Sequence, residues 1–143
     1  MAVRTASAEW KGELQSGEGS FASESGALDG AYSFSSRFGD SGGTNPEELI
    51  GAAHAACFSM ALAGVLGEGG NPPESVKTDA KVQLLKDGDG FTITRIDLVT
   101  VGRVPGIDAD GFAQAAQVAK ENCPVSRALA SVGEITVDAT LEG

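Results

Sequence analysis

The sequence has few of the residues that build metal centres or disulfide scaffolds. Its 143 residues include only two cysteines and one histidine. Structural zinc sites and small disulfide-rich domains both need more of these side chains than a chain of this composition offers. We therefore expect no disulfide scaffold, no self-contained metal site and no bound cofactor.

Positive charge is also scarce. Lysine and arginine together number 10, against 20 aspartates and glutamates, so the net charge is −10. A surface this acidic repels phosphate backbones and anionic lipid headgroups. We therefore expect neither nucleic acid nor a membrane surface as a partner.

Signals for export are lacking too. The segment from Met1 to Ala6 has no apolar core of the kind found in signal peptides, and no Asn-x-Ser/Thr acceptor is present. The uncharged run from Leu49 to Leu66 approaches the length of a membrane span, but it is rich in alanine and glycine and has acidic flanks. We interpret it as a buried central helix and expect a cytoplasmic protein.

Glycine, by contrast, is abundant, at 20 residues. The glycines follow no collagen-like period, so they indicate turns and close backbone contacts. Hydrophobic residues make up 41% and charged residues 21% of the chain, which is typical of a globular protein. The length fits one domain over residues 1–143.

The order of predicted elements indicates an α+β fold. In the first third, we predict strands over residues 6–14, 21–24 and 32–38, followed by a glycine loop at 39–43. A helix then begins with Asn45 as N-cap and Pro46 as its first residue, and we expect it to end at Gly67.

The second half predicts further strands over residues 76–86 and 91–104, which flank a hairpin turn at 87–90. Asp108 can cap a helix that presents Phe112, Ala115, Ala116 and Ala119 at helical spacing. Pro124 opens a short helix, and residues 133–141 form a last strand with Ile135, Val137, Ala139 and Leu141 on one face.

The helix over residues 49–66 is apolar on every side. A two-layer domain of this size covers only one face of such a helix. We therefore expect the other face to meet the same helix of a second copy, which predicts a homodimer.

One loop imitates a catalytic motif. The run from Gly39 to Gly43 spells the sequence found around the nucleophile of chymotrypsin-like serine proteases. That mechanism needs a histidine base, and the only histidine, His54, follows Ser41 on an apolar helix. We therefore interpret this run as a glycine loop that precedes a helix cap.

The positions of the two cysteines leave several roles open. Cys57 lies within the apolar helix, where a cysteine usually behaves as an inert hydrophobic residue. Cys123 precedes Pro124 at a helix start, where the helix dipole favours the thiolate, so position alone names Cys123 as the more reactive thiol. The pair could be inert, could bind a metal or could form a redox couple.

Four segments closely resemble the osmotically inducible protein C (OsmC) family. The longest covers residues 44–62, and the others are 36–38, 104–109 and 122–126; the resemblance runs in matching order from Ala8 to Leu141. It is closer to OsmC than to the sister organic hydroperoxide resistance (Ohr) branch. Arg37 stands where OsmC carries its catalytic arginine, whereas residues 17–20 lack the arginine of the Ohr branch.

The resemblance implies a thiol-dependent peroxidase that reduces organic hydroperoxides in oxidative or osmotic stress. By family analogy, Cys57 is the attacking cysteine, Cys123 resolves its sulfenic acid as an intramolecular disulfide, and Arg37 and Glu47 form a polar network around Cys57. The resemblance also suggests a dithiol reductant, such as a lipoyl group. The alternative is a non-enzymatic stress protein that binds a hydrophobic ligand.

The resemblance further implies an OsmC-like fold, in which antiparallel sheets wrap around two long central helices of an intertwined homodimer. Glu47 and Cys57 are ten residues apart, so on one straight helix they cannot touch, and we expect Glu47 to reach the site from the partner chain. His54 lies one turn before Cys57 and is either a base toward the thiol or a packed histidine.

Overall fold

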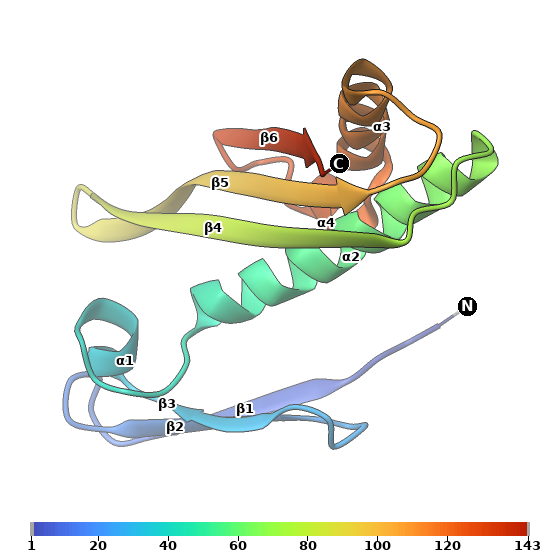
Figure 1. The fold of residues 1–143 in the computed structure, drawn as a ribbon. Helices are drawn as coiled ribbons and strands as arrows, with labels where there is room; N and C mark the ends of the chain where they lie inside the picture. Colours follow the sequence, from blue (N-terminus) through green and yellow to red (C-terminus); the bar gives the residue numbers. More distant parts are fainter. Residues whose placement is uncertain (1, 143) are drawn as a thin grey trace. The chain divides into compact units, whose positions relative to one another are not determined.

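The computed structural model describes residues 2–142 (Figure 1). The chain forms two compact units, the first ending at Leu49 and the second beginning at Ile50. Each unit has its own three-stranded sheet, and each is described below by itself.

The first unit is built on an antiparallel sheet of β1 (Ala6–Lys11), β2 (Glu18–Ser23) and β3 (Asp29–Tyr32), in that order. The rings of Trp10 and Tyr32 lie 5.6 Å apart, on either side of Gly19 in the strand register. A Cβ atom on Gly19 would lie 2.6 Å from the Tyr32 ring and 2.7 Å from the Trp10 ring. Only glycine therefore lets the two rings close over this strand.

Residues 34–38 form the short helix α1 (Phe34–Phe38), so the predicted strand over residues 32–38 is wrong beyond Tyr32. The Ser36 N–H donates to the Ser33 Oγ atom at 3.1 Å, and the Ser33 N–H donates to the Ser36 Oγ atom at 2.8 Å. This reciprocal capping starts a helix in a segment whose alternation of aromatic residues and serines imitates a strand.

The long helix α2 (Pro46–Glu68) begins where the sequence predicts. The Glu48 N–H donates to the Asn45 Oδ1 atom at 2.8 Å, which is the expected N-cap bond. The helix ends at Glu68 rather than at Gly67, because the left-handed residue that closes it is Gly70, with φ of 87°.

The second unit is built on a sheet of β4 (Ser75–Asp87), β5 (Gly90–Arg103) and β6 (Glu134–Leu141). The predicted hairpin is present, since Asp87 pairs with Gly90 and the two strands run antiparallel. β6, however, runs parallel to β5, so the expectation of wholly antiparallel sheets is wrong here. Two helices connect β5 to β6, and this crossover brings the chain back in the same direction.

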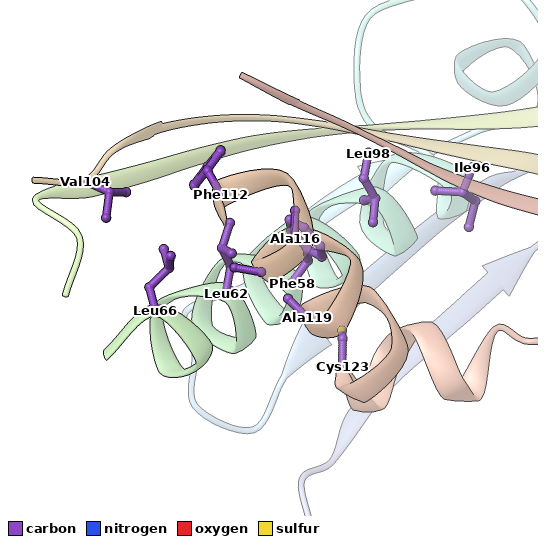
Figure 2. Packing of buried hydrophobic residues seen from close by; sticks show 11 residues of the cluster. Phe58, Leu62, Leu66, Ile96, Leu98, Val104, Phe112, Ala116, Ala119 and Cys123 are labelled. Carbon is purple, nitrogen blue, oxygen red and sulfur yellow. The ribbon is translucent and has the colours of Figure 1, made fainter. Parts of the chain in front are cut away.

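These two helices are α3 (Ala109–Asn122) and α4 (Pro124–Ala128). The Gly111 N–H donates to the Asp108 Oδ1 atom at 2.8 Å, so Asp108 caps α3 as predicted. The core lies between α2, α3 and one face of the second sheet (Figure 2). It includes Phe58, Leu62 and Leu66 of α2, Ile96 and Leu98 of β5, and the four predicted residues of α3, and the predicted face of β6 packs against it.

Much of α2 lies outside this core. It is long and apolar enough to span a membrane by length and composition, a test that core helices of soluble proteins also pass. Only 28% of its most apolar window is buried, and Met60 is 78% exposed. The second unit by itself therefore leaves an apolar face of α2 uncovered.

Candidate active site

The second unit brings the two cysteines together. Cys57 lies in the middle of α2, and Cys123 lies between α3 and α4. Both thiols are free, and they lie within hydrogen-bonding reach of one another. Cys123 belongs to the buried core, and Cys57, half-buried, packs against it.

The position of Cys123 is fixed by the break between two helices. It is the C-cap of α3 and the N-cap of α4, and Pro124 supplies the first residue of α4. The Cys123 N–H donates to the Ala119 carbonyl at 2.8 Å, and the Arg127 N–H donates to the Cys123 carbonyl at 3.0 Å. Because both backbone groups are bonded, the sulfur is held at a fixed place in the core (Figure 2).

Burial raises the pKa of the Cys123 thiol, but several donors outweigh it and the net direction is down. They are the Ser126 backbone N–H, the Cys57 thiol, the Ser126 hydroxyl and the Val125 backbone N–H. The Cys123 side chain makes no capping hydrogen bond to α4, but the backbone of Ser126 and of Val125 still lowers the pKa of its thiol. The position-based expectation of a more acidic Cys123 thiol is confirmed.

The pKa of the Cys57 thiol moves in the opposite direction. Burial raises it first, and the hydrogen bond with Cys123 raises it further, whereas the Val125 backbone opposes both. The two neighbouring thiols therefore shift each other's pKa in opposite directions. A thiolate at Cys57 needs positive charge that residues 50–142 do not place in contact with it.

The first unit holds the other two predicted site residues, and it pairs them directly. Arg37, in the last turn of α1, donates to Glu47, in the first turn of α2. The Nη2–Oε1 distance is 2.6 Å, and Nε lies 3.1 Å from Oε1 and 3.2 Å from Oε2. Two guanidinium nitrogens thus hold one carboxylate, the geometry in which arginine binds a carboxylate most strongly.

This pair is shielded on one side and open on the other. The Glu47 side chain is only 10% exposed, whereas the Arg37 side chain is 36% exposed. The Phe38 ring centroid lies 5.3 Å from the Arg37 guanidinium carbon. Glu48 instead accepts from the Thr44 hydroxyl at 2.8 Å. The arrangement leaves Arg37 with free N–H donors on a face that an anionic group can approach.

His54 is bound to a residue that the sequence analysis did not single out. Its side chain is fully buried, and its Nε2 atom lies 2.7 Å from the Ser126 Oγ atom. Its Nδ1 atom has no hydrogen-bond partner, and burial lowers the pKa of the imidazole. Of the two roles considered for His54, the structure favours the packed histidine. Ser126 follows Cys123 by three residues on a helix, a spacing that could have indicated its contact with the sulfur.

Phe58 and Phe112 are fully buried core residues, and Ile107 packs partly against the core. Ser41 of the protease-like loop bonds to the Ser35 hydroxyl at 2.7 Å. Over residues 2–142, no group of three or more histidine, cysteine, aspartate or glutamate side chains is arranged to hold a metal ion.

The site is a pair of neighbouring free thiols in an α+β fold, which is typical of a small thiol-dependent redox protein. Comparison with known proteins identifies the family. Residues 39–138 match the family described as OsmC-like protein. The chain belongs to the OsmC family. It is 52% identical over 136 residues to peroxiredoxin OsmC of Escherichia coli K12, and the match covers 94% of each chain.

The sister branch is also similar. The organic hydroperoxide resistance protein of Xanthomonas axonopodis pv. citri is 35% identical over 127 residues, which cover 87% of this chain and 86% of that protein. Among solved structures, the organic hydroperoxide resistance protein OhrB of Bacillus subtilis superposes with a TM-score of 0.68 at 28% identity, covering 96% of this chain and 98% of that one. The OsmC-like α+β fold is therefore confirmed.

Proposed function

We propose that this protein is a peroxidase that reduces organic hydroperoxides to alcohols, with Cys57 as the attacking and Cys123 as the resolving cysteine. The observation that carries the proposal is the proximity of two free thiols, which lie close enough to shift each other's pKa. The chain has no third cysteine, so this pair accounts for its whole thiol chemistry. The names of its relatives, a peroxiredoxin and a hydroperoxide resistance protein, support the same activity.

The two thiols together supply the two electrons that reduce one hydroperoxide to an alcohol and water. The Cys57 thiolate attacks the terminal oxygen of the hydroperoxide, the O–O bond breaks, and the alkoxide takes up a proton and leaves as an alcohol. Cys57 is now a sulfenic acid. The Cys123 thiolate attacks its sulfur, the S–S bond forms as the S–O bond breaks, and water leaves. An external dithiol then reduces the disulfide and is itself oxidised.

The first step requires a cation beside Cys57, since burial alone raises the pKa of this thiol. Arg37 fits this requirement because its guanidinium stays charged and Glu47 fixes its orientation. Its remaining donors suit the oxygen on which negative charge develops as the O–O bond breaks.

We assign this Arg37–Glu47 pair to the Cys57 of a partner chain. Within one α-helix, the ten residues between Glu47 and Cys57 span about 15 Å along the axis, so Glu47 cannot contact its own Cys57. The uncovered apolar face of α2, where Met60 is 78% exposed, supports a homodimer in which two copies of α2 meet. Each site would then be completed by the other chain.

The assay that tests the function follows the loss of cumene hydroperoxide with reduced protein. We expect Cys57→Ser to consume no hydroperoxide, and Cys123→Ser to complete one turnover and then stop. Unchanged consumption by Cys57→Ser would contradict the enzymatic reading. A first turnover that needs Cys123 but not Cys57 would reverse the two roles, as the lowered pKa of Cys123 allows. A dihydrolipoyl compound should sustain turnover better than a monothiol.

A further inference from the structure

We propose that His54 and Ser126 form a buried hydrogen-bond relay that positions Cys123 as the resolving thiolate. The proposal rests on the proposed peroxidase function and adds two positioning residues to it. The relay runs from His54 on α2 through Ser126 on α4 to the sulfur of Cys123. Neither side chain touches the hydroperoxide in this scheme, because both act through Cys123.

The two residues of the relay are buried and lie close together. His54 Nε2 and Ser126 Oγ lie 2.7 Å apart, and the two residues are 0% and 6% exposed. Ser126 lies in the first turn of α4, directly after the helix break that fixes Cys123. Both its hydroxyl and its backbone N–H interact with the Cys123 sulfur. A buried polar pair of this kind is costly unless its groups are bonded, so its place beside a reactive thiol needs an explanation.

Counting protons gives the direction of each bond. A thiolate only accepts, so the single hydroxyl proton of Ser126 points to the Cys123 sulfur. The Ser126 oxygen must then accept from His54, which places the imidazole proton on Nε2. This tautomer leaves Nδ1 with a bare lone pair, in agreement with its lack of a partner. The other tautomer would bury an unpaired N–H, which native proteins rarely do.

The relay acts by hydrogen bonding and not by charge. Burial lowers the pKa of His54, so its imidazole is neutral at physiological pH. Lys120, Glu121 and Arg127 border a shallow depression beside Ser126. No hydrogen bond or ion pair described for residues 2–142 joins these three to His54 or Ser126. The basic atom of this tautomer is Nδ1, and it has no hydrogen-bond partner, so no contact connects it to the Cys57 thiol.

The consequence concerns the second step of the reaction. Ser126 lowers the pKa of the Cys123 thiol, so the attacking thiolate forms more readily, and His54 holds the Ser126 hydroxyl in the rotamer that stabilises it. When Cys123 attacks the Cys57 sulfenic acid, the S–S bond forms and the departing hydroxide takes up a proton, as in the proposed reaction.

A measurement on the unmodified protein tests the proton count. His54 is the only histidine in the sequence, so histidine-labelled protein gives the nitrogen signals of one imidazole. We expect the neutral Nε2–H tautomer with an unprotonated Nδ1 throughout neutral pH. An Nδ1–H tautomer, or a charged imidazole, would overturn the relay.

Substitutions test the effect on Cys123. In a Cys57→Ser background, Ser126→Ala and His54→Leu should raise the pKa of Cys123, read from the thiolate absorbance. In the protein with both cysteines, they should slow the conversion of the Cys57 sulfenic acid to the disulfide about tenfold, the typical worth of one hydrogen bond to a charged group. His54→Gln, whose amide N–H can replace Nε2–H, should restore both values. A Cys123 pKa that does not change in Ser126→Ala and His54→Leu would overturn the proposal.

Thr100→Val is the matched control. Thr100 is also fully buried, and its hydroxyl bonds to Thr78 and to the Lys77 carbonyl, away from the relay. This variant should lose stability and keep the Cys123 pKa, and a shift as large as that of Ser126→Ala would mean that general destabilisation is the cause. The tautomer and the pKa need no hydroperoxide. If wild-type protein consumes none, the proposed function fails while these readouts still decide whether the relay exists.

Discussion

Cys57 and Cys123 lie close enough to shift each other's pKa, and the pKa of Cys57 is raised while that of Cys123 is lowered. Cys123 is therefore the more acidic thiol of the single chain, although the proposed mechanism gives the first attack to Cys57. The two facts agree if positive charge reaches Cys57 only in the assembled dimer. Three predictions follow from this relationship and from the burial of His54, and each can be checked independently.

The first concerns the Arg37 guanidinium. Arg37→Ala should lower the rate of the first turnover by about a hundredfold, because the thiolate and the developing oxyanion both lose their stabilising charge. Arg37→Lys should recover little, since lysine cannot form the two-nitrogen contact with Glu47. Stopped-flow measurement of hydroperoxide loss with reduced protein checks both.

The control for this prediction is Arg103→Ala. Arg103 makes a pair of similar geometry with Glu142, in which Nη2 and Nε lie 2.6 and 3.1 Å from Oε1, but both side chains are more than half exposed. An exposed pair contributes little, so this variant should keep wild-type rates. Equal losses in Arg37→Ala and Arg103→Ala would mean that Arg37 has no special part in the chemistry.

The second prediction concerns the assignment of Arg37 to the partner chain. A heterodimer of Cys57→Ser with Arg37→Ala, purified through two different tags, should have about half of the wild-type activity. In it, Cys57 of one chain meets Arg37 of the other, which completes one site of the two. Each variant homodimer should be nearly inactive. If the heterodimer is inactive as well, Arg37 serves its own chain.

The third prediction concerns stability against pH. Burial keeps the pKa of His54 below its ordinary value. As the pH falls, the imidazole therefore binds a proton in the unfolded chain before it does so in the folded chain. The stabilisation is complete above about pH 6.5 and is lost as the pH falls below that value. In urea titrations at about pH 7.5 and about pH 5.5, His54→Gln should lose less unfolding free energy than wild type. If both proteins lose the same unfolding free energy between the two pH values, a group other than His54 is responsible for the pH dependence.

The sequence predicts those parts of this protein that depend on local signals. Asn45 and Pro46 predict the start of α2 because a cap and a first-turn proline act within a few residues. The capping box at Ser33 was missed because serines between aromatic residues match a strand pattern equally well. The parallel pairing of β6 was missed because the direction of a strand depends on the crossover before it, and no residue of β6 encodes that.

The candidate site divides in the same way. The acidity of Cys123 could be predicted from Pro124, which places the cysteine at a helix start. The pairing of Arg37 with Glu47, and of Cys57 with Cys123, came from family resemblance and not from any spacing in the chain. Ser126 was missed because a hydroxyl near a cysteine carries no signal until packing brings His54 to it from another helix.

The central claim is that Cys57 is oxidised first and Cys123 resolves it. The most direct test is the intact mass and peptide map of reduced protein after one equivalent of cumene hydroperoxide. We expect wild type to lose the mass of two hydrogens through a Cys57–Cys123 disulfide, and Cys123→Ser to gain one oxygen on Cys57. An oxygen found on Cys123 in Cys57→Ser, with Cys57 left reduced in Cys123→Ser, would contradict it.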